Sequence, residues 1–95
     1  MRMRRQIERE AGEVVQLVDT SRRQWQAQRQ ALEASQAATR RVQRGWQLGA
    51  LGIGDLLLAE RVQRQIALDE ATARIVAEQA RLWVLVDAHE LWHDE

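Results

Sequence analysis

The stretch that decides the fold is LGALGIGDLLL, residues 48–58. Its first seven residues hold three of the five glycines of the chain, Gly49, Gly52 and Gly54. Glycine adopts positive φ values at little cost, so it can end a helix and reverse the chain. Asp55 then stands where an acidic side chain favours the start of a helix, and three leucines follow. The stretch therefore predicts a turn over 48–54 between two helices.

The residues before the turn carry a heptad-like apolar stripe. From Ile7, alternating steps of four and three reach twelve positions, of which eight are apolar. They are Ile7, Ala11, Val14, Val18, Ser21, Trp25, Gln28, Leu32, Ser35, Thr39, Val42 and Trp46. This spacing is typical of a helix that packs against a partner along one side, and no proline interrupts it. It predicts one helix over about 2–47.

The residues after the turn predict a second helix, over about 55–92, with two apolar stripes. The first consists of Val62, Ile66, Asp69, Ala73, Val76, Ala80 and Trp83, and the second of Leu68, Ala71, Ile75, Leu82 and Leu85. A helix with two apolar stripes has more than one neighbour. We therefore expect an all-α fold, a long antiparallel and coiled-coil-like hairpin over 1–95 without an independent second domain. Further helices, from other copies or other parts of the same polypeptide, are expected to pack against it.

Composition and charge exclude several classes of protein. Without cysteine there is no disulfide framework and no thiolate chemistry. Fourteen basic residues balance fourteen acidic ones, which argues against a protein devoted to nucleic acid. The first half is basic and the second acidic, so the two halves should attract each other. The start MRMRR lacks a following apolar stretch and the longest uncharged run is too short for a bilayer, so we expect neither a signal peptide nor a membrane span.

The motif HELWH, His89 to His93, matches the pattern of zinc-dependent hydrolases. Its two histidines are spaced to share one helix face, and Glu90 could act as the base. A catalytic zinc normally has three protein ligands, and the chain has no third histidine. We interpret the motif as a polar helix end, with His89 and His93 as the only candidate metal ligands. No enzyme activity and no cofactor are expected.

Two further patterns have simple structural explanations. Gly49, Gly52 and Gly54 reverse the order of the dinucleotide-binding fingerprint, and no strand precedes them. Arginine pairs at 4–5, 22–23 and 40–41 recur every eighteen residues, or five helical turns, and mark a solvated face. Trp25, Trp46 and Trp83 lie on the apolar stripes, so we interpret them as packing residues.

Residues 40–92 resemble the C-terminal part of the TolC family of bacterial outer-membrane efflux proteins. In that family an aromatic residue in a G-Y-x-x-G context precedes a short turn, and an aspartate, a leucine and an alanine open the returning helix. The same order here reads Gly45, Trp46, Gly49, then Asp55, Leu57 and Ala59. Within this stretch, only residues 44–59 are specific to the family pattern. Tryptophan stands in place of the usual tyrosine, Leu58 stands at a position that is acidic in some members, and the ending DAHELW resembles the heavy-metal branch.

The resemblance implies a function that the apolar periodicity alone does not imply. Such proteins are homotrimers in which a β-barrel in the outer membrane continues into a periplasmic tunnel of antiparallel helices. By resemblance this chain is the second of two hairpins per subunit that reach the tunnel tip, on the periplasmic side of the outer membrane. Trp46, Gly49, Gly52 and Gly54 would meet a periplasmic adaptor protein that serves an inner-membrane pump, and Asp55 would lie at the constriction.

The sequence leaves three candidate functions. The first is a passive conduit segment of a tripartite efflux or secretion system, with the chain expected to be a fragment of the parent protein. The second is an autonomous hairpin that associates with itself as a cytosolic helical scaffold. The third, zinc hydrolysis through HELWH, lacks a third ligand and a substrate cleft. The exported substrate and the oligomeric state of the fragment do not follow from the residues.

Overall fold

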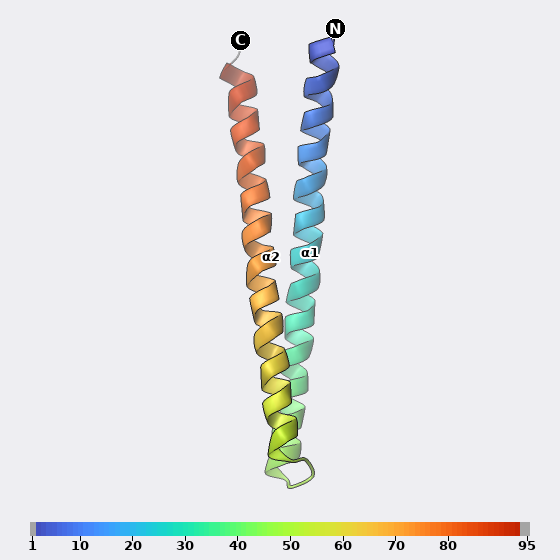
Figure 1. Ribbon diagram of the computed structural model, residues 1–95, viewed down its shortest axis with the longest axis vertical. Helices are drawn as coiled ribbons and strands as arrows, with labels where there is room; N and C mark the ends of the chain where they lie inside the picture. Colours follow the sequence, from blue (N-terminus) through green and yellow to red (C-terminus); the bar gives the residue numbers. More distant parts are fainter. Residues whose placement is uncertain (1, 94–95) are drawn as a thin grey trace. The chain divides into compact units, whose positions relative to one another are not determined.

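The computed structural model describes the backbone of residues 2–93 and the side chains of residues 12, 13 and 15–86. The fold is all-α and consists of two long helices packed antiparallel, α1 over Arg2–Gln47 and α2 over Ile53–His93 (Figure 1). The first helix occupies the range that its stripe predicts. The second begins two residues before the expected Asp55. Both helices contribute to two compact units. Unit 1 comprises Met1–Trp25 with Ala73–Glu95, and unit 2 comprises Gln26–Thr72.

The end of α1 is closed by backbone hydrogen bonds around Gly49. The Gly49 N–H donates to the Trp46 carbonyl oxygen at 3.0 Å, and the Ala50 N–H donates to the Gly45 carbonyl oxygen at 2.8 Å. This pair of bonds is the Schellman motif, which requires a residue with left-handed φ at its centre. Gly49 has φ of 77°, and no other described residue has a positive φ. Glycine is therefore needed at this position because its backbone adopts a left-handed φ, and not because a larger side chain would lack room.

The start of α2 is capped by Asp55. Its carboxylate Oδ2 accepts a hydrogen bond from the backbone N–H of Gly52 at 3.2 Å, and the Asp55 N–H donates to the Gly52 carbonyl oxygen at 3.1 Å. Gly52 is thus the residue just before the helix and Asp55 is the third residue within it. The carboxylate thus makes one of the two hydrogen bonds of a capping box, the one from the third helical residue back to the N-cap. It satisfies the Gly52 N–H, which has no partner within the helix.

In unit 2 the helices pack through alternating three- and four-residue steps on both partners. The Thr39 hydroxyl donates to the Ser35 carbonyl oxygen within α1 at 2.9 Å and lies 3.4 Å from the Ala59 carbonyl oxygen of α2. This contact places Thr39 opposite Ala59, and by helical spacing Val42 opposite Leu56. Leu56 is 7% exposed, the most buried side chain of this unit. The seam of α1 predicted from sequence is therefore confirmed here as far as Val42.

In unit 1 the packing is made by small side chains. Ser21 is 2% exposed, and Ala77 and Ala80 are the buried apolar residues opposite. The Ser21 hydroxyl donates to the Leu17 carbonyl oxygen at 2.6 Å, and among the described side chains no buried nitrogen or oxygen lacks a hydrogen-bond partner. Small residues let two helix backbones approach closely, but they bury little apolar area. This seam therefore gives close packing with modest hydrophobic stabilisation.

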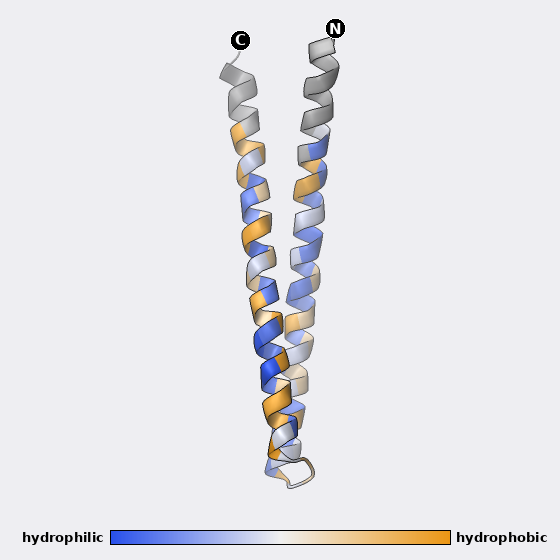
Figure 2. Ribbon diagram, viewed as in Figure 1, coloured by the Kyte–Doolittle hydropathy of each residue, from blue (hydrophilic) through white to orange (hydrophobic). Residues whose placement is uncertain are grey.

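The seam of α2 differs from both predicted stripes. Its inward positions follow Leu56, Ala59, Gln63, Ile66, Glu70, Ala73, Ala77, Ala80 and Val84. The first predicted stripe shares only Ile66, Ala73 and Ala80 with this seam, because its other members are exposed. Trp83 is 62% exposed and Trp46 is 41% exposed, so the interpretation of these two tryptophans as packing residues is wrong within the hairpin. Figure 2 shows why the predicted stripes of α2 differ from its seam: hydrophobic residues recur at many levels of α2, whereas α1 is largely hydrophilic.

Candidate docking surfaces

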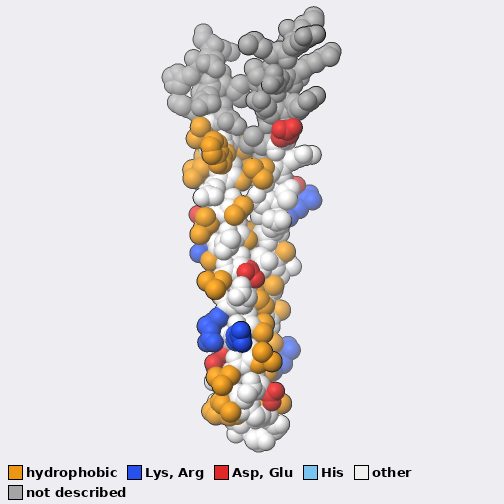
Figure 3. Space-filling view, viewed as in Figure 1, with side chains coloured by type: hydrophobic (Ala, Val, Ile, Leu, Met, Phe, Trp, Pro, Cys, Tyr) orange, Lys and Arg blue, Asp and Glu red, His pale blue; other side chains and the backbone are white. Residues whose placement is uncertain are grey.

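Away from α1, the surface of α2 carries many large apolar side chains in both units, interspersed with polar ones such as Arg61 and Gln79. We call its exposed large apolar residues the outer apolar surface: Leu57, Leu58, Val62 and Leu68 in unit 2, and Ile75, Val76, Leu82, Trp83, Leu85 and Val86 in unit 1. Figure 3 shows hydrophobic side chains along the exposed face of each unit. Exposed apolar area of this extent makes the surface a candidate interaction site. The second predicted stripe contributes Leu68, Ile75, Leu82 and Leu85 to this surface, and α1 leaves all four exposed.

The amount of exposed surface agrees with an unpartnered module. The chain has a mass of 11.0 kDa and exposes 8224 Å². A compact monomer of this mass exposes roughly 5600 Å². The excess, roughly 2600 Å², is surface that the two helices do not cover for each other.

The turn carries a second group of exposed apolar residues. Leu48 is 78% exposed, and Leu51 and Ile53 are also exposed beside Trp46. Turns usually expose polar residues, so apolar side chains at three of these positions make the turn a candidate contact surface. The sequence-based prediction placed a partner at Trp46, Gly49, Gly52 and Gly54 but did not include the three aliphatic residues. Their apolar character within a glycine-rich turn was the available signal.

The glycines and the aspartate predicted at the tip lie together around the turn, and all of them except Gly54 have a structural role there. Gly49 supplies the left-handed residue and Asp55 caps α2. At Gly45, an added Cβ would lie 2.7 Å from the Leu51 Cδ1 atom, so glycine lets the turn fold back onto α1. At Gly54 an added Cβ would meet no atom within 4 Å. The geometry builds a rigid turn, and it does not bring further acidic side chains beside Asp55 within one chain.

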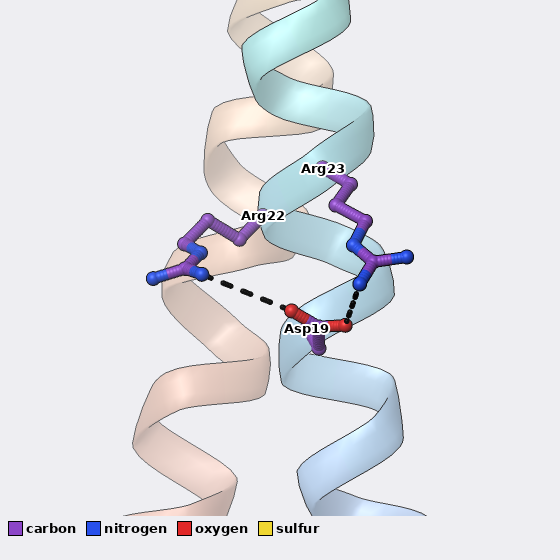
Figure 4. Close-up of polar contacts among 3 residues, drawn as sticks. All are labelled: Asp19, Arg22 and Arg23. Atoms are coloured by element: carbon purple, nitrogen blue, oxygen red, sulfur yellow. Dashed lines mark ion pairs between the residues drawn. The ribbon is translucent and has the colours of Figure 1, made fainter.

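The outer surface of α1 is cationic. Asp19 pairs with two arginines in unit 1: its Oδ2 lies 3.0 Å from Arg23 Nη2 and its Oδ1 lies 3.8 Å from Arg22 Nη2 (Figure 4). All three side chains are well exposed, so these ion pairs stabilise the helix only slightly. In unit 2, Arg40, Arg41 and Arg44 line a hollow together with Ala37, Gly45 and Leu48. No ion pair joins these three arginines to any described residue.

The candidate metal ligands fall outside the described side chains. The backbone of α2 continues through His89 to His93, so HELWH lies on a helix, but the environment of its side chains is not described. Within residues 12–86, no group of three or more histidine, aspartate or glutamate side chains could hold a metal ion. The same part of the chain contains no helix that is long and apolar enough to cross a bilayer.

Comparison with protein-family models, with curated protein sequences and with solved structures gives no match for this chain.

Proposed function

We propose that this hairpin is a wall segment of a periplasmic conduit, part of an outer-membrane efflux or secretion channel of the TolC type. The observation that carries the proposal is the outer apolar surface of α2. A helix in the wall of a closed tunnel needs neighbours on two sides, and α2 has one side packed on α1 and another apolar side uncovered. The segment takes part in passage of a substrate and carries out no reaction.

The parent in this proposal is a trimeric α-barrel that meets a periplasmic adaptor, which in turn serves an inner-membrane pump. The exposed apolar residues of the turn, Leu48, Leu51 and Ile53, support such a contact because they project from a rigid turn. Asp55 stands at the same end of the molecule. In a symmetric trimer its three copies form a ring of carboxylates, which attracts cations at the narrow end of the tunnel.

Cysteine labelling in cells tests the location and the packing together. The natural chain has no cysteine, so Leu51→Cys and Leu82→Cys each introduce a unique thiol. In cells that lack the adaptor, with the outer membrane permeabilised and the inner membrane intact, we expect a membrane-impermeant maleimide to label Leu51→Cys in the turn. Leu82→Cys should be protected until the protein is denatured, because neighbouring helices cover the outer apolar surface. Labelling of Leu51→Cys only after the inner membrane is broken contradicts a periplasmic conduit.

Asp55 provides a second test because its capping and its charge can be separated. Asp55→Asn keeps an acceptor for the Gly52 N–H but removes the charge, whereas Asp55→Ala removes both. Capping predicts that Asp55→Ala lowers the free energy of unfolding by about 1 kcal/mol and that Asp55→Asn lowers it less. A constriction predicts that both variants weaken the block of channel conductance by divalent cations to the same degree. Unchanged block in both variants would restrict Asp55 to its role as a cap.

The second candidate is a self-associating helical scaffold, and the same outer apolar surface favours it. Copies of the hairpin could cover one another's α2 without any export role. The labelling experiment separates the two candidates, because a scaffold in the cytosol protects Leu82→Cys but leaves Leu51→Cys unlabelled until the inner membrane opens.

A further inference from the structure

Two arginine pairs on α1 have the same internal spacing but different surroundings. The pair at 22–23 shares the carboxylate of Asp19, which stands three residues before the first arginine and four before the second (Figure 4). For the pair at 40–41, Ala37 stands at the equivalent place. No ion pair joins these two arginines to any described residue. The second pair therefore lacks the counter-charge that the first pair receives from its own helix.

The hollow on α1 in unit 2 lies where that counter-charge would stand. The arginines of the hollow fall within about 6 Å along the helix axis, and like charges at this spacing destabilise a helix slightly. A carboxylate placed in the hollow removes this repulsion. Since apolar surface lies beside the charges, the hollow is suited to a carboxylate that is accompanied by an apolar side chain. Its lining consists of three arginines and three small or apolar residues: Arg40, Arg41, Arg44, Ala37, Gly45 and Leu48.

The hairpin does not supply this carboxylate itself. The contact between Thr39 and Ala59 shows which side of α1 faces α2. By helical spacing, the middle of the hollow at Arg44 lies on the opposite side of α1, and no acidic side chain lines it. The carboxylate of Asp55 is already bonded to the Gly52 N–H. The counter-charge for the hollow therefore has to come from outside the hairpin.

The exposed surface of α2 in a second copy is a poor source of that charge. Leu57 and Leu58 are exposed apolar residues of the same unit, and by helical spacing Arg61 lies between them. Docking these leucines into the hollow would bring Arg61 against three other arginines. A polypeptide of different sequence is therefore the better partner.

The remainder of this side of α1 argues against a membrane or a nucleic acid as the partner. Before Ala37, helical spacing continues the side with Glu33, Gln30 and Gln26, which are polar and exposed. A helix that lies on a membrane needs an apolar face along its length. A nucleic acid needs a longer basic stripe without an acidic residue in its path. A short hollow with a polar continuation instead fits a short acidic segment of a protein.

We propose that the hollow binds an acidic helix that another polypeptide supplies. Two carboxylates one turn apart on that helix pair with Arg40 and Arg44, which are also one turn apart, and Arg41 shares one of these carboxylates. An apolar side chain one turn farther along the partner packs against Leu48. The contact goes beyond the proposed conduit, because it defines the chemistry of one neighbour in any assembly.

Binding of a defined peptide tests the contact. The probe is a fluorescent peptide of about 20 residues, long enough to form a helix in water, with two glutamates one turn apart and a leucine one turn later. In anisotropy titrations, the purified natural chain should bind this peptide about tenfold more tightly than the same peptide with glutamines in place of the glutamates. The difference should shrink as the salt concentration rises.

Ala37→Asp gives the sharpest variant, because it rebuilds the arrangement seen at Asp19 and leaves every arginine in place. Its carboxylate neutralises the pair at 40–41 within the helix, so affinity for the glutamate peptide should fall about tenfold. Ala27→Asp is the matched control. It adds the same charge at an exposed position of α1 about 15 Å away along the axis and should bind the peptide like the natural chain. Helical circular dichroism confirms that both variants fold.

Charge reversal adds a gain of binding to these losses. Arg40→Glu/Arg44→Glu should lose affinity for the glutamate peptide and should bind a peptide with lysines in place of the two glutamates, which the natural chain does not bind. A purely structural role of the two arginines would not transfer binding from one peptide to the other.

Four results overturn the proposal. The first two are a natural chain that binds the glutamate peptide no better than the glutamine peptide, and an Ala37→Asp chain that binds it like the natural chain. If vesicles of phosphatidylglycerol bind in place of the peptide and Ala37→Asp abolishes their binding, the hollow belongs to a lipid surface. If Arg40→Glu/Arg44→Glu weakens self-association as much as peptide binding, the hollow belongs to a second copy. None of these results bears on the labelling in cells, so the proposed function is tested separately.

Discussion

Gly49→Val is expected to lower the free energy of unfolding of the hairpin by about 2 kcal/mol. Gly49 has φ of 77°, a conformation that a β-branched residue strongly disfavours. An added Cβ would meet no atom within 4 Å, so the cost comes from the backbone conformation and not from a collision. Gly49→Asn should cost less than Gly49→Val, because asparagine tolerates left-handed φ. Urea unfolding at one fixed protein concentration measures both values.

Gly54→Ala is the matched control for this prediction. Gly54 lies in the first turn of α2 with open space around it and no positive φ, and alanine has a higher helix propensity than glycine. We expect this variant to be more stable than the natural chain by about 0.5 kcal/mol. Equal losses of stability at Gly49 and Gly54 would show that left-handed backbone is not what the turn requires.

The largest effect is expected from the outer apolar surface. Leu68→Gln/Ile75→Gln/Leu82→Gln replaces three exposed residues at heptad spacing on α2. The natural chain should associate at micromolar concentration, because its own seams bury few large side chains. If association covers these three side chains, their loss removes roughly 3–4 kcal/mol, which raises the dissociation constant at least a hundredfold. Sedimentation equilibrium measures the change.

Association should also contribute to the stability of the folded chain. Partners that bind only the folded state raise the melting temperature as protein concentration rises. The natural chain should show this dependence, and the triple variant should lose it. Thr20→Gln/Ala27→Gln/Ala34→Gln changes three exposed positions at the same heptad spacing on α1 and should retain it. A natural chain that melts as a stable monomer at all concentrations contradicts the expectation of a covered outer surface.

The fold was largely predictable from sequence because the turn and the seam of α1 have unambiguous patterns. Three glycines within seven residues favour a break between helices, and α1 has few large apolar residues outside its seam, so one face was the clear choice for packing. The seam of α2 was less predictable. Val62, Val76 and Trp83 are as apolar as the true seam residues Ile66 and Val84, and periodicity cannot distinguish equally apolar neighbouring stripes.

The candidate surfaces were predictable only in part. The expectation of additional partners for α2 follows from counting its apolar stripes, and the position of the tip residues follows from the turn. The hollow on α1 did not follow, because Arg40 and Arg41 form one of the regularly spaced arginine pairs that were interpreted as a solvated face. Only the coordinates show that these arginines, Arg44 and Leu48 line one depression.

The turn between the helices is closed by backbone hydrogen bonds on the α1 side and by the Asp55 carboxylate on the α2 side. It therefore fixes the rotational phase of α2 about its own axis. Each residue advances an α-helix by about 100°, so one inserted residue in the turn would rotate α2 by that angle. Most helices would then present polar residues to their partner, but α2 would present another set of leucines and valines. In this hairpin the length of the loop, more than the composition of the helix, determines which side of α2 is left for a neighbour.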